Sequence, residues 1–246
     1  LKDRFGRLNL NKVKAFCREN GVSENVLFLT AFNYCIGIFS GEKDAISTSI
    51  HSGRTDGRWI RLAGPLFLTY LFRYTVIPHE TVPELLRRAG KQVMESMRCH
   101  ISTIHGDEMF FQYQGDILNI NEIGGAPAER LKIQLDALPF HLQVFSDSQG
   151  YYYELRYWEN RFDRDQLAVF MTCMERIVEA MLEEPSARRL KTHLPENVFP
   201  KHYFIKASVV NRTAGFRLIP EIGWDMEVKA YVLDDACRKQ PFGGWG

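Results

Sequence analysis

Apolar residues recur at helical spacing in four segments of the chain. The segments are residues 10–20, 23–41, 81–98 and 163–181. In the first, third and fourth, the apolar residues share one face, which predicts amphipathic helices. In the second, they surround most of the segment, which is typical of a helix buried in a core.

Polar residues at the ends of these segments provide capping signals. Asn20-Gly21 predicts the C-terminal end of the first helix, and Ser23 predicts the start of the second. Thr81 and Glu84 have the spacing of a capping box at the start of the third. These signals set the boundaries of three helices to within one or two residues.

Shorter segments alternate between apolar and polar residues, or are rich in aromatic and β-branched residues, as strands are. They are residues 45–50, 66–76, 110–114, 140–145 and 151–157. Ser148-Gln149-Gly150 separates the last two, which predicts a β-hairpin. Residues 119–130 contain two glycines and a proline and are predicted to form a loop. Because helices and hairpins mix along the chain, we predict an α+β fold with a mixed or antiparallel sheet covered by helices on one face.

The character of the sequence changes after Glu184. Prolines and basic residues punctuate the stretch that follows, as in a linker. We therefore predict a lobe at residues 1–190, a linker at 191–203 and a small β-rich tail at 204–246, which is too short to hold a core of its own. The chain begins with Leu1 instead of a methionine, so we expect a fragment of a longer protein.

The charge balance and the apolar stretches exclude several classes of function. The 31 basic and 30 acidic residues give a net charge of +1, and the basic residues are scattered. This argues against partners such as nucleic acid or an anionic membrane. The most apolar stretch, residues 26–39, is too short to span a bilayer. The five cysteines lack metal-ligand or redox spacing, and we expect a cytoplasmic protein with reduced thiols.

Familiar catalytic motifs are missing from the sequence. It contains no glycine-rich phosphate loop, no serine elbow and no metal-ligand cluster. His100 and His105 are five residues apart, which does not place them on one helical face, so we interpret them as a polar helix end or loop. His141 lies in a predicted strand, where a solvent-facing side chain is favoured over one in a cleft. A histidine can act as a general base, but the sequence gives this one no partner.

Several short motifs follow one another in a defined order. Residues 20–27 lead into the long apolar helix, and a strand and the loop Ser52-Gly53-Arg54 come next. This order resembles that of condensation domains of nonribosomal peptide synthetases. That family then has a stretch of the type I-G-x-F-V-N-T-x-x-x-R. Its glycine, threonine and arginine are matched here by Gly64, Thr69 and Arg73.

Two positions depart from the family pattern. Leu66 stands where the family has Phe, and Leu68 stands where it has Asn. The resemblance nevertheless continues over roughly residues 8–190. Phe111-Gln112-Tyr113-Gln114 is similar to the family strand F-Q-V-M-F-N-Y-Q, and Phe140-His141-Leu142 is similar to a strand of the type F-D-L. The family segment H-Q-D-x-P-F-E is barely recognisable at residues 100–105.

The tail resembles a different domain. Residues 222–235 and 240–246 are similar to the strand V-Y-V-L-D-E and the turn P-x-G-x-x-G-E-L of adenylation domains, whose nucleotide-binding and phosphate-loop motifs are absent. Condensation followed by adenylation is the usual domain order in these synthetases, so the two resemblances agree. We therefore expect residues 204–246 to be an adenylation-domain-like fragment that does not adenylate a substrate.

The resemblance implies a fold like chloramphenicol acetyltransferase, with two lobes and a substrate tunnel between them. The catalytic H-H-x-x-x-D-G motif of the family belongs to the N-terminal lobe and is absent here. We therefore assign residues 1–190 to the C-terminal lobe and expect neither a catalytic residue nor a metal site in this chain. The residues that the resemblance places along the tunnel are Ser52, Arg54, Gly64, Thr69, Arg73, Gln112, Gln114 and His141.

The implied function is part of a synthetase that joins a carrier-bound acyl or aminoacyl thioester to a carrier-bound amine. The expected partners are the N-terminal lobe, the carrier proteins with their phosphopantetheine, and the adjacent adenylation domain; no cofactor is expected to bind directly. The chain alone is expected to be inactive. A non-catalytic interaction module, or a stand-alone lobe of an acyltransferase that uses coenzyme A, are the alternatives. A lobe without its partner should also expose an apolar face and self-associate.

Overall fold

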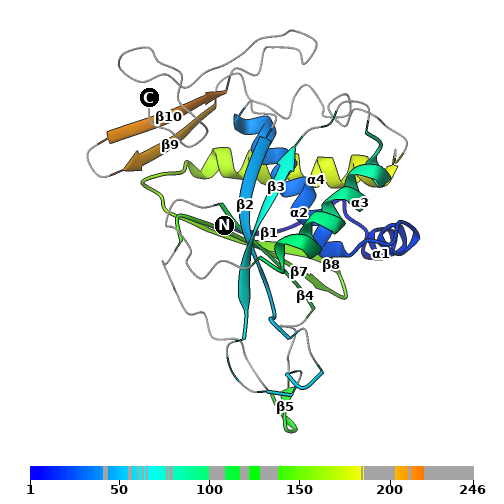
Figure 1. Ribbon diagram of the computed structural model, residues 1–246. Coiled ribbons are helices and arrows are strands. Elements are labelled where there is room, and N and C mark those ends of the chain that lie inside the picture. The colour runs from blue at the N-terminus through cyan, green and yellow to red at the C-terminus, as the bar shows by residue number, and fades with distance from the viewer. Residues whose placement is uncertain are drawn as a thin grey trace.

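A six-stranded sheet with helices packed on one face forms the body of the protein (Figure 1). The computed structural model describes residues 1–40, 44–54, 57–59, 61, 62, 64, 66–75, 77, 80–99, 109–116, 122–127, 138–183, 185, 203–209 and 212–218. This architecture confirms the predicted α+β fold with a mixed sheet.

The four predicted helices are confirmed, and their boundaries lie close to those predicted. They are α1 (Leu10–Glu19), α2 (Glu24–Ser40), α3 (Val82–Ser96) and α4 (Arg164–Glu183). Gly21 follows α1 with φ of 64°, and the Ser23 hydroxyl accepts a hydrogen bond from the Val26 N–H at 3.2 Å. At the start of α3, one carboxylate oxygen of Glu84 accepts from both the backbone N–H and the hydroxyl of Thr81, at 2.8 and 2.7 Å. Local sequence therefore determines where these helices begin and end.

The main sheet has the strand order β1-β8-β7-β4-β2-β3. Its strands are β1 (Lys2–Arg4), β2 (Asp44–His51), β3 (Leu68–Thr75), β4 (Met109–Gly115), β7 (Phe140–Asp147) and β8 (Gly150–Tyr157). The central neighbours β2/β4 and β4/β7 are parallel, and the other pairs are antiparallel. The predicted hairpin of β7 and β8 is confirmed, with Asp147 paired to Gly150 across its turn.

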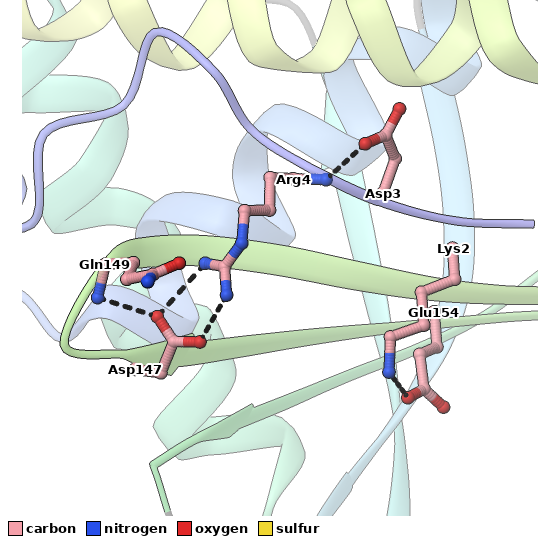
Figure 2. Close-up of polar contacts among 6 residues, drawn as sticks. All are labelled: Lys2, Asp3, Arg4, Asp147, Gln149 and Glu154. Carbon is pink, nitrogen blue, oxygen red and sulfur yellow. Dashed lines mark hydrogen bonds and ion pairs between the residues drawn. The ribbon is translucent and has the colours of Figure 1, made fainter.

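Strand β1 was not predicted from the sequence. It pairs antiparallel with β8 and forms the outer edge of the sheet. Two ion pairs cross this edge (Figure 2): the Arg4 guanidinium donates to both carboxylate oxygens of Asp147 at 3.0 and 2.6 Å, and the Lys2 ammonium donates to Glu154 at 2.9 Å. The charged residues that hide β1 from pattern analysis therefore also attach it to the hairpin of β7 and β8.

Two smaller hairpins lie outside the main sheet. Part of the segment predicted as a loop forms β5 (Glu122–Ile123) and β6 (Ala126–Pro127), because two consecutive glycines between them adopt positive φ and make a tight turn. In the tail, β9 (Tyr203–Val209) pairs with β10 (Arg212–Leu218), and their backbones approach α4 and α2. Tyr203, which we assigned to the linker, is thus the first residue of β9. Most of that linker and the adenylation-like residues 222–246 lie outside the described residues.

A single apolar core fills the space between the helices and the sheet. Phe32 on α2 lies at its centre, with its ring 5.3 Å from Phe111, 5.9 Å from Phe140 and 5.8 Å from Phe170. The predicted stripe of α4 is buried in this core: Leu167, Phe170, Met171, Met174, Ile177, Val178 and Met181. The Met and aromatic residues of the helices therefore serve packing.

Among the described residues, no single helix is both long and apolar enough to cross a membrane. Helices α1 and α2 would meet the requirement only as a pair, and a bend of 99° separates them. The described cysteines are all free thiols. Cys17, Cys35 and Cys173 are buried in the core, and Cys99 is exposed.

Candidate functional site

The two faces of the main sheet have different surroundings. Side chains alternate along each strand, so Leu142 and Val144 point into the core while Gln143 points away from it. The helices pack on the core face. We call the opposite side the second face. Its central side chains are those of Phe110, Gln112, His141, Gln143, Phe145, Tyr152, Glu154 and Arg156.

Three polar side chains form a connected group in the middle of this second face. Gln112 on β4 lies in register with Gln143 on the parallel strand β7, and His141 lies two residues before Gln143. The Gln112 side-chain oxygen accepts a hydrogen bond from the Gln143 amide at 3.0 Å and lies 3.2 Å from His141 Nε2. We call Gln112, His141 and Gln143 the polar cluster.

His141 is half-buried on the second face, where the sequence favoured a side chain facing solvent. Its ring packs edge-on against Phe110, with centroids 4.9 Å apart. Burial, and then the positive charge of Arg156 on β8, lower the pKa of His141 to about 4. The imidazole is therefore neutral at pH 7, and because Gln112 presents an oxygen, Nε2 carries the proton. A base with so low a pKa accepts protons poorly at neutral pH.

Gln143 completes the polar cluster, although sequence analysis did not select it. Only 6% of the residue is exposed, and its side-chain oxygen is buried without a hydrogen-bond partner among the described residues. Buried acceptors are normally paired, so the unpaired oxygen distinguishes Gln143 from other buried polar residues. The signal available in the sequence was its spacing of two residues from His141, which puts both on one face of a strand.

The loop residues matched to the condensation-domain family make contacts within their own loop. The Arg54 guanidinium donates to the backbone carbonyls of Ser52, Leu62 and Gly64, at 3.3, 3.1 and 3.1 Å. Gly53 has φ of 67°, and a Cβ there would lie 1.7 Å from the carbonyl oxygen of Leu66. Arg54, Ser52 and Gly64 thus shape the loop in this structure, and their role along a tunnel remains a prediction.

The strand residues matched to the family lie at the other end of the sheet. Thr69 and Arg73 point to the second face from β3, two strands away from the polar cluster. Thr69 is buried, whereas exposed Arg73 makes a bidentate ion pair with Asp44. Gln114 lies at a bulge of β4, between Tyr113 and Gly115. The structure thus brings together two separate groups of the eight predicted residues: Gln112 with His141, and Arg54 with Ser52 and Gly64.

A second polar group lies on the core side of the sheet. The hydroxyls of Tyr113 and Tyr151 both donate to the same oxygen of Glu24, at 2.6 and 2.5 Å. Burial, followed by these hydrogen bonds to the carboxylate, raises the pKa of both tyrosines. We call these three residues the Glu24 cluster. It ties the start of α2 to β4 and β8 and was not predicted from the sequence.

Neither group has the composition of a metal centre. Among the described residues, no set of three or more His, Cys, Asp or Glu side chains could hold a metal ion. The polar cluster contains two neutral amides and one neutral imidazole, a set suited to hydrogen bonding with a neutral ligand.

Comparison with known proteins identifies solved structures with a similar fold. No protein family and no curated protein matches the sequence. Among solved structures, the chain is similar to holo-AB3403, a four-domain nonribosomal peptide synthetase bound to AMP and glycine, with a TM-score of 0.63 and 12% identity over 76% of this chain. It is also similar to the condensation domain of the monacolin K polyketide synthase MokA, with a TM-score of 0.58 and 15% identity over 76% of this chain. A third similar structure is the X-domain in its complex with OxyB from teicoplanin biosynthesis, with a TM-score of 0.58 and 16% identity over 81% of this chain.

The chain therefore has the fold of a condensation-domain lobe, with a mixed six-stranded sheet and helices on one face. It spans 47% of the MokA and X-domain chains and 17% of the four-domain synthetase. At these identities the similarity concerns the fold, and the activity must be argued from the residues.

Proposed function

We propose that the chain is the C-terminal lobe of a condensation domain and contributes one wall of its substrate tunnel. The observation that carries this proposal is the structural match, which covers three quarters of this chain but less than half of a condensation domain. The ordered motifs from the Ser52-Gly53-Arg54 loop to Arg73 support the C-terminal assignment. The tail is proposed to be an adenylation-domain fragment, in keeping with the usual domain order.

In this proposal, the chain positions substrates and leaves proton transfer to the other lobe. The three side chains of the polar cluster are neutral at pH 7, and His141 is a poor base there. Carrier proteins would deliver the thioester and the amine, each on phosphopantetheine. The lobe would then help to hold the thioester beside the amine in an orientation fit for attack. Holding two reactants in this way accounts for a large share of the rate of such reactions.

Reconstitution with the rest of the domain tests the proposal. The N-terminal lobe encoded upstream in the same gene is expressed separately, mixed with this chain, and supplied with an acyl thioester and an amine on their carrier proteins. We expect peptide-bond formation from the mixture and none from this chain alone. Product from the isolated chain, or an upstream sequence without a His-His-x-x-x-Asp-Gly motif, would overturn the proposal.

The second candidate function is a non-catalytic interaction module. The X-domain, which shares the fold, was solved in complex with OxyB, so this fold can serve as a binding surface. Leu68 in place of the family's Asn favours this candidate for the present chain. It predicts that the reconstituted pair makes no product with any carrier-bound substrate, while a neighbouring protein from the same gene cluster co-purifies with the lobe in a defined stoichiometry.

A further inference from the structure

The two edges of the main sheet differ in how well they are protected against pairing with another strand. Strand β1 is three residues long and all three are charged, which is typical of a protected edge. Strand β3 is eight residues long, and Arg73 is its only charged residue. Among the described residues, β3 has a single neighbour in the sheet, β2, so the backbone groups on its other side have no strand to pair with there.

The one charge of β3 is balanced within its own sheet. The Arg73 guanidinium donates from Nε to both carboxylate oxygens of Asp44 on β2, at 3.0 and 2.8 Å. Because the carboxylate balances the guanidinium, an incoming strand does not meet an unbalanced charge at this edge. Strand β3 therefore lacks the charge protection that β1 has.

Exposed apolar side chains lie along the β3 edge. Phe67, one residue before β3, is 57% exposed, and Leu71 in the middle of the strand is 43% exposed. Tyr70 and Phe72, which alternate with Leu71, are buried on the core side. A strand added at this edge would cover Leu71 and Phe67 without disturbing the core, and covering apolar surface favours association.

The sequence of β3 is suited to pairing with a second copy of itself. In an antiparallel pair with a two-fold axis at Leu71, the two Leu71 side chains meet, Tyr70 lies opposite Phe72, and Thr69 lies opposite Arg73. Pairs of apolar and of aromatic side chains stabilise neighbouring strands. This register also keeps the two Arg73 residues four positions apart along the strands, about 14 Å, so like charges do not face each other.

We propose that β3 is an interface through which two copies of this chain pair in antiparallel fashion, with Leu71 at the two-fold axis. The two main sheets then form one continuous sheet. The interface uses the edge of the sheet and leaves its second face open, so it goes beyond the proposed function and does not rest on it.

Disulfide trapping tests this interface at single residues. In a protein that carries Cys99→Ser and Cys237→Ser, the further substitution Leu71→Cys would place two thiols at the two-fold axis. Opposite residues of an antiparallel pair have Cα atoms about 4.5–5.5 Å apart, within the limit of roughly 7 Å for a disulfide. The protein is oxidised with diamide over a series of concentrations and run on a non-reducing gel. We expect a covalent dimer at twice the chain mass of 28.5 kDa, in a yield that rises with concentration.

Two variants on the same side of the sheet are the controls. Arg73→Cys lies on β3 itself, about 14 Å from its counterpart in the other copy. Ile46→Cys replaces a residue that is 48% exposed on β2, and both β3 strands separate it from its counterpart. Neither variant should form a covalent dimer beyond the level of random collision. Cross-linking of either control to the same extent as Leu71→Cys, or no covalent dimer from Leu71→Cys at any concentration, overturns the proposal.

A mixture of two variants tests the register. Thr69→Cys and Arg73→Cys should each remain uncoupled alone and should form a covalent dimer when mixed, because Thr69 of one copy lies opposite Arg73 of the other. A dimer from Thr69→Cys alone, or none from the mixture, would contradict a two-fold axis at Leu71.

Discussion

Protonation of His141 is coupled to the stability of the fold. Its pKa of about 4 in the folded protein lies below the value near 6.5 of an unfolded chain. The unfolded state therefore binds the proton more tightly, so the contribution is fully present above pH 6.5 and is lost as the pH falls toward 4. Between pH 7 and pH 5 we expect a loss of about 2 kcal/mol from this residue, measured by denaturant unfolding at the two pH values.

The variant His141→Gln isolates this contribution, because glutamine does not titrate and can still donate toward Gln112. Its unfolding free energy should change less between pH 7 and pH 5 than that of the unmodified protein, by about 2 kcal/mol. An identical pH dependence in both proteins would mean that another group carries the effect.

Two glycines with similar backbone angles allow the cost of a strained backbone to be measured apart from the cost of a steric clash. Gly53 has φ of 67° and Gly21 has φ of 64°, but only a Cβ at Gly53 would strike another atom, the carbonyl oxygen of Leu66. Gly21→Ala should cost about 1 kcal/mol, the price of the left-handed backbone alone. Gly53→Ala should cost more than about 3 kcal/mol, because the loop must also move. Thermal or denaturant unfolding measures both, and equal losses would contradict the collision.

The sequence could indicate His141 and Gln112 as candidates but not their surroundings. Whether a strand residue faces solvent depends on its neighbours across the sheet, and those of His141 are Phe110 and Arg156, from other strands. Gln143 has no motif at all, since its importance comes from an unpaired oxygen. Residue types and spacing therefore predict which positions lie on a strand, whereas the polar cluster is recognised only from contacts between strands.

At the scale of elements, the Glu24 cluster should stabilise the junction of α2 with the sheet. Tyr113→Phe and Tyr151→Phe each remove one hydrogen bond to a charged acceptor and should cost about 1.5–3 kcal/mol. Both hydroxyls donate to one oxygen, so their contributions should be coupled. The loss of unfolding free energy in the double variant should therefore differ from the sum of the losses in the two single variants.

Unfolding measurements on the two single variants and the double variant give this coupling free energy. Tyr157→Phe on the same sheet is the control, because burial and nearby charges, and no hydrogen bond to Glu24, account for the raised pKa of Tyr157. Strict additivity would show that the two tyrosines are not coupled to each other through Glu24.

Helices were predicted well because their signals are local. Thr81 and Glu84 are three residues apart and define the start of α3 without reference to the rest of the chain. Strand β1 was missed because three consecutive charged residues show no alternation, and their conformation depends on β8, far away in sequence. The Glu24 cluster was missed for the same reason: its residues come from three separate elements.

At the scale of the whole molecule, the second face carries exposed apolar side chains near the edge strand β3. Ile46 is 48% exposed and Leu71 is 43% exposed on adjacent strands. We expect these residues to drive the predicted self-association, and Ile46→Lys with Leu71→Lys to shift the protein toward the monomer. Light scattering over a wide concentration range measures the shift.

Met94→Lys is the matched control, since Met94 is 61% exposed on α3 instead of the sheet. An equal shift toward the monomer in this variant would mean that any added charge reduces self-association. If the unmodified protein is a monomer at all concentrations, the prediction is contradicted.

Because β1 pairs with β8, this edge of the sheet can form only after β8 has been synthesised. Lys2 and Glu154 are 152 residues apart, so β1 is synthesised long before the strand with which it pairs. Contacts this distant in sequence form late, because a long loop must close first. Nascent chains arrested before the β7–β8 hairpin leaves the exit tunnel should therefore be open to proteolysis in the β1 segment.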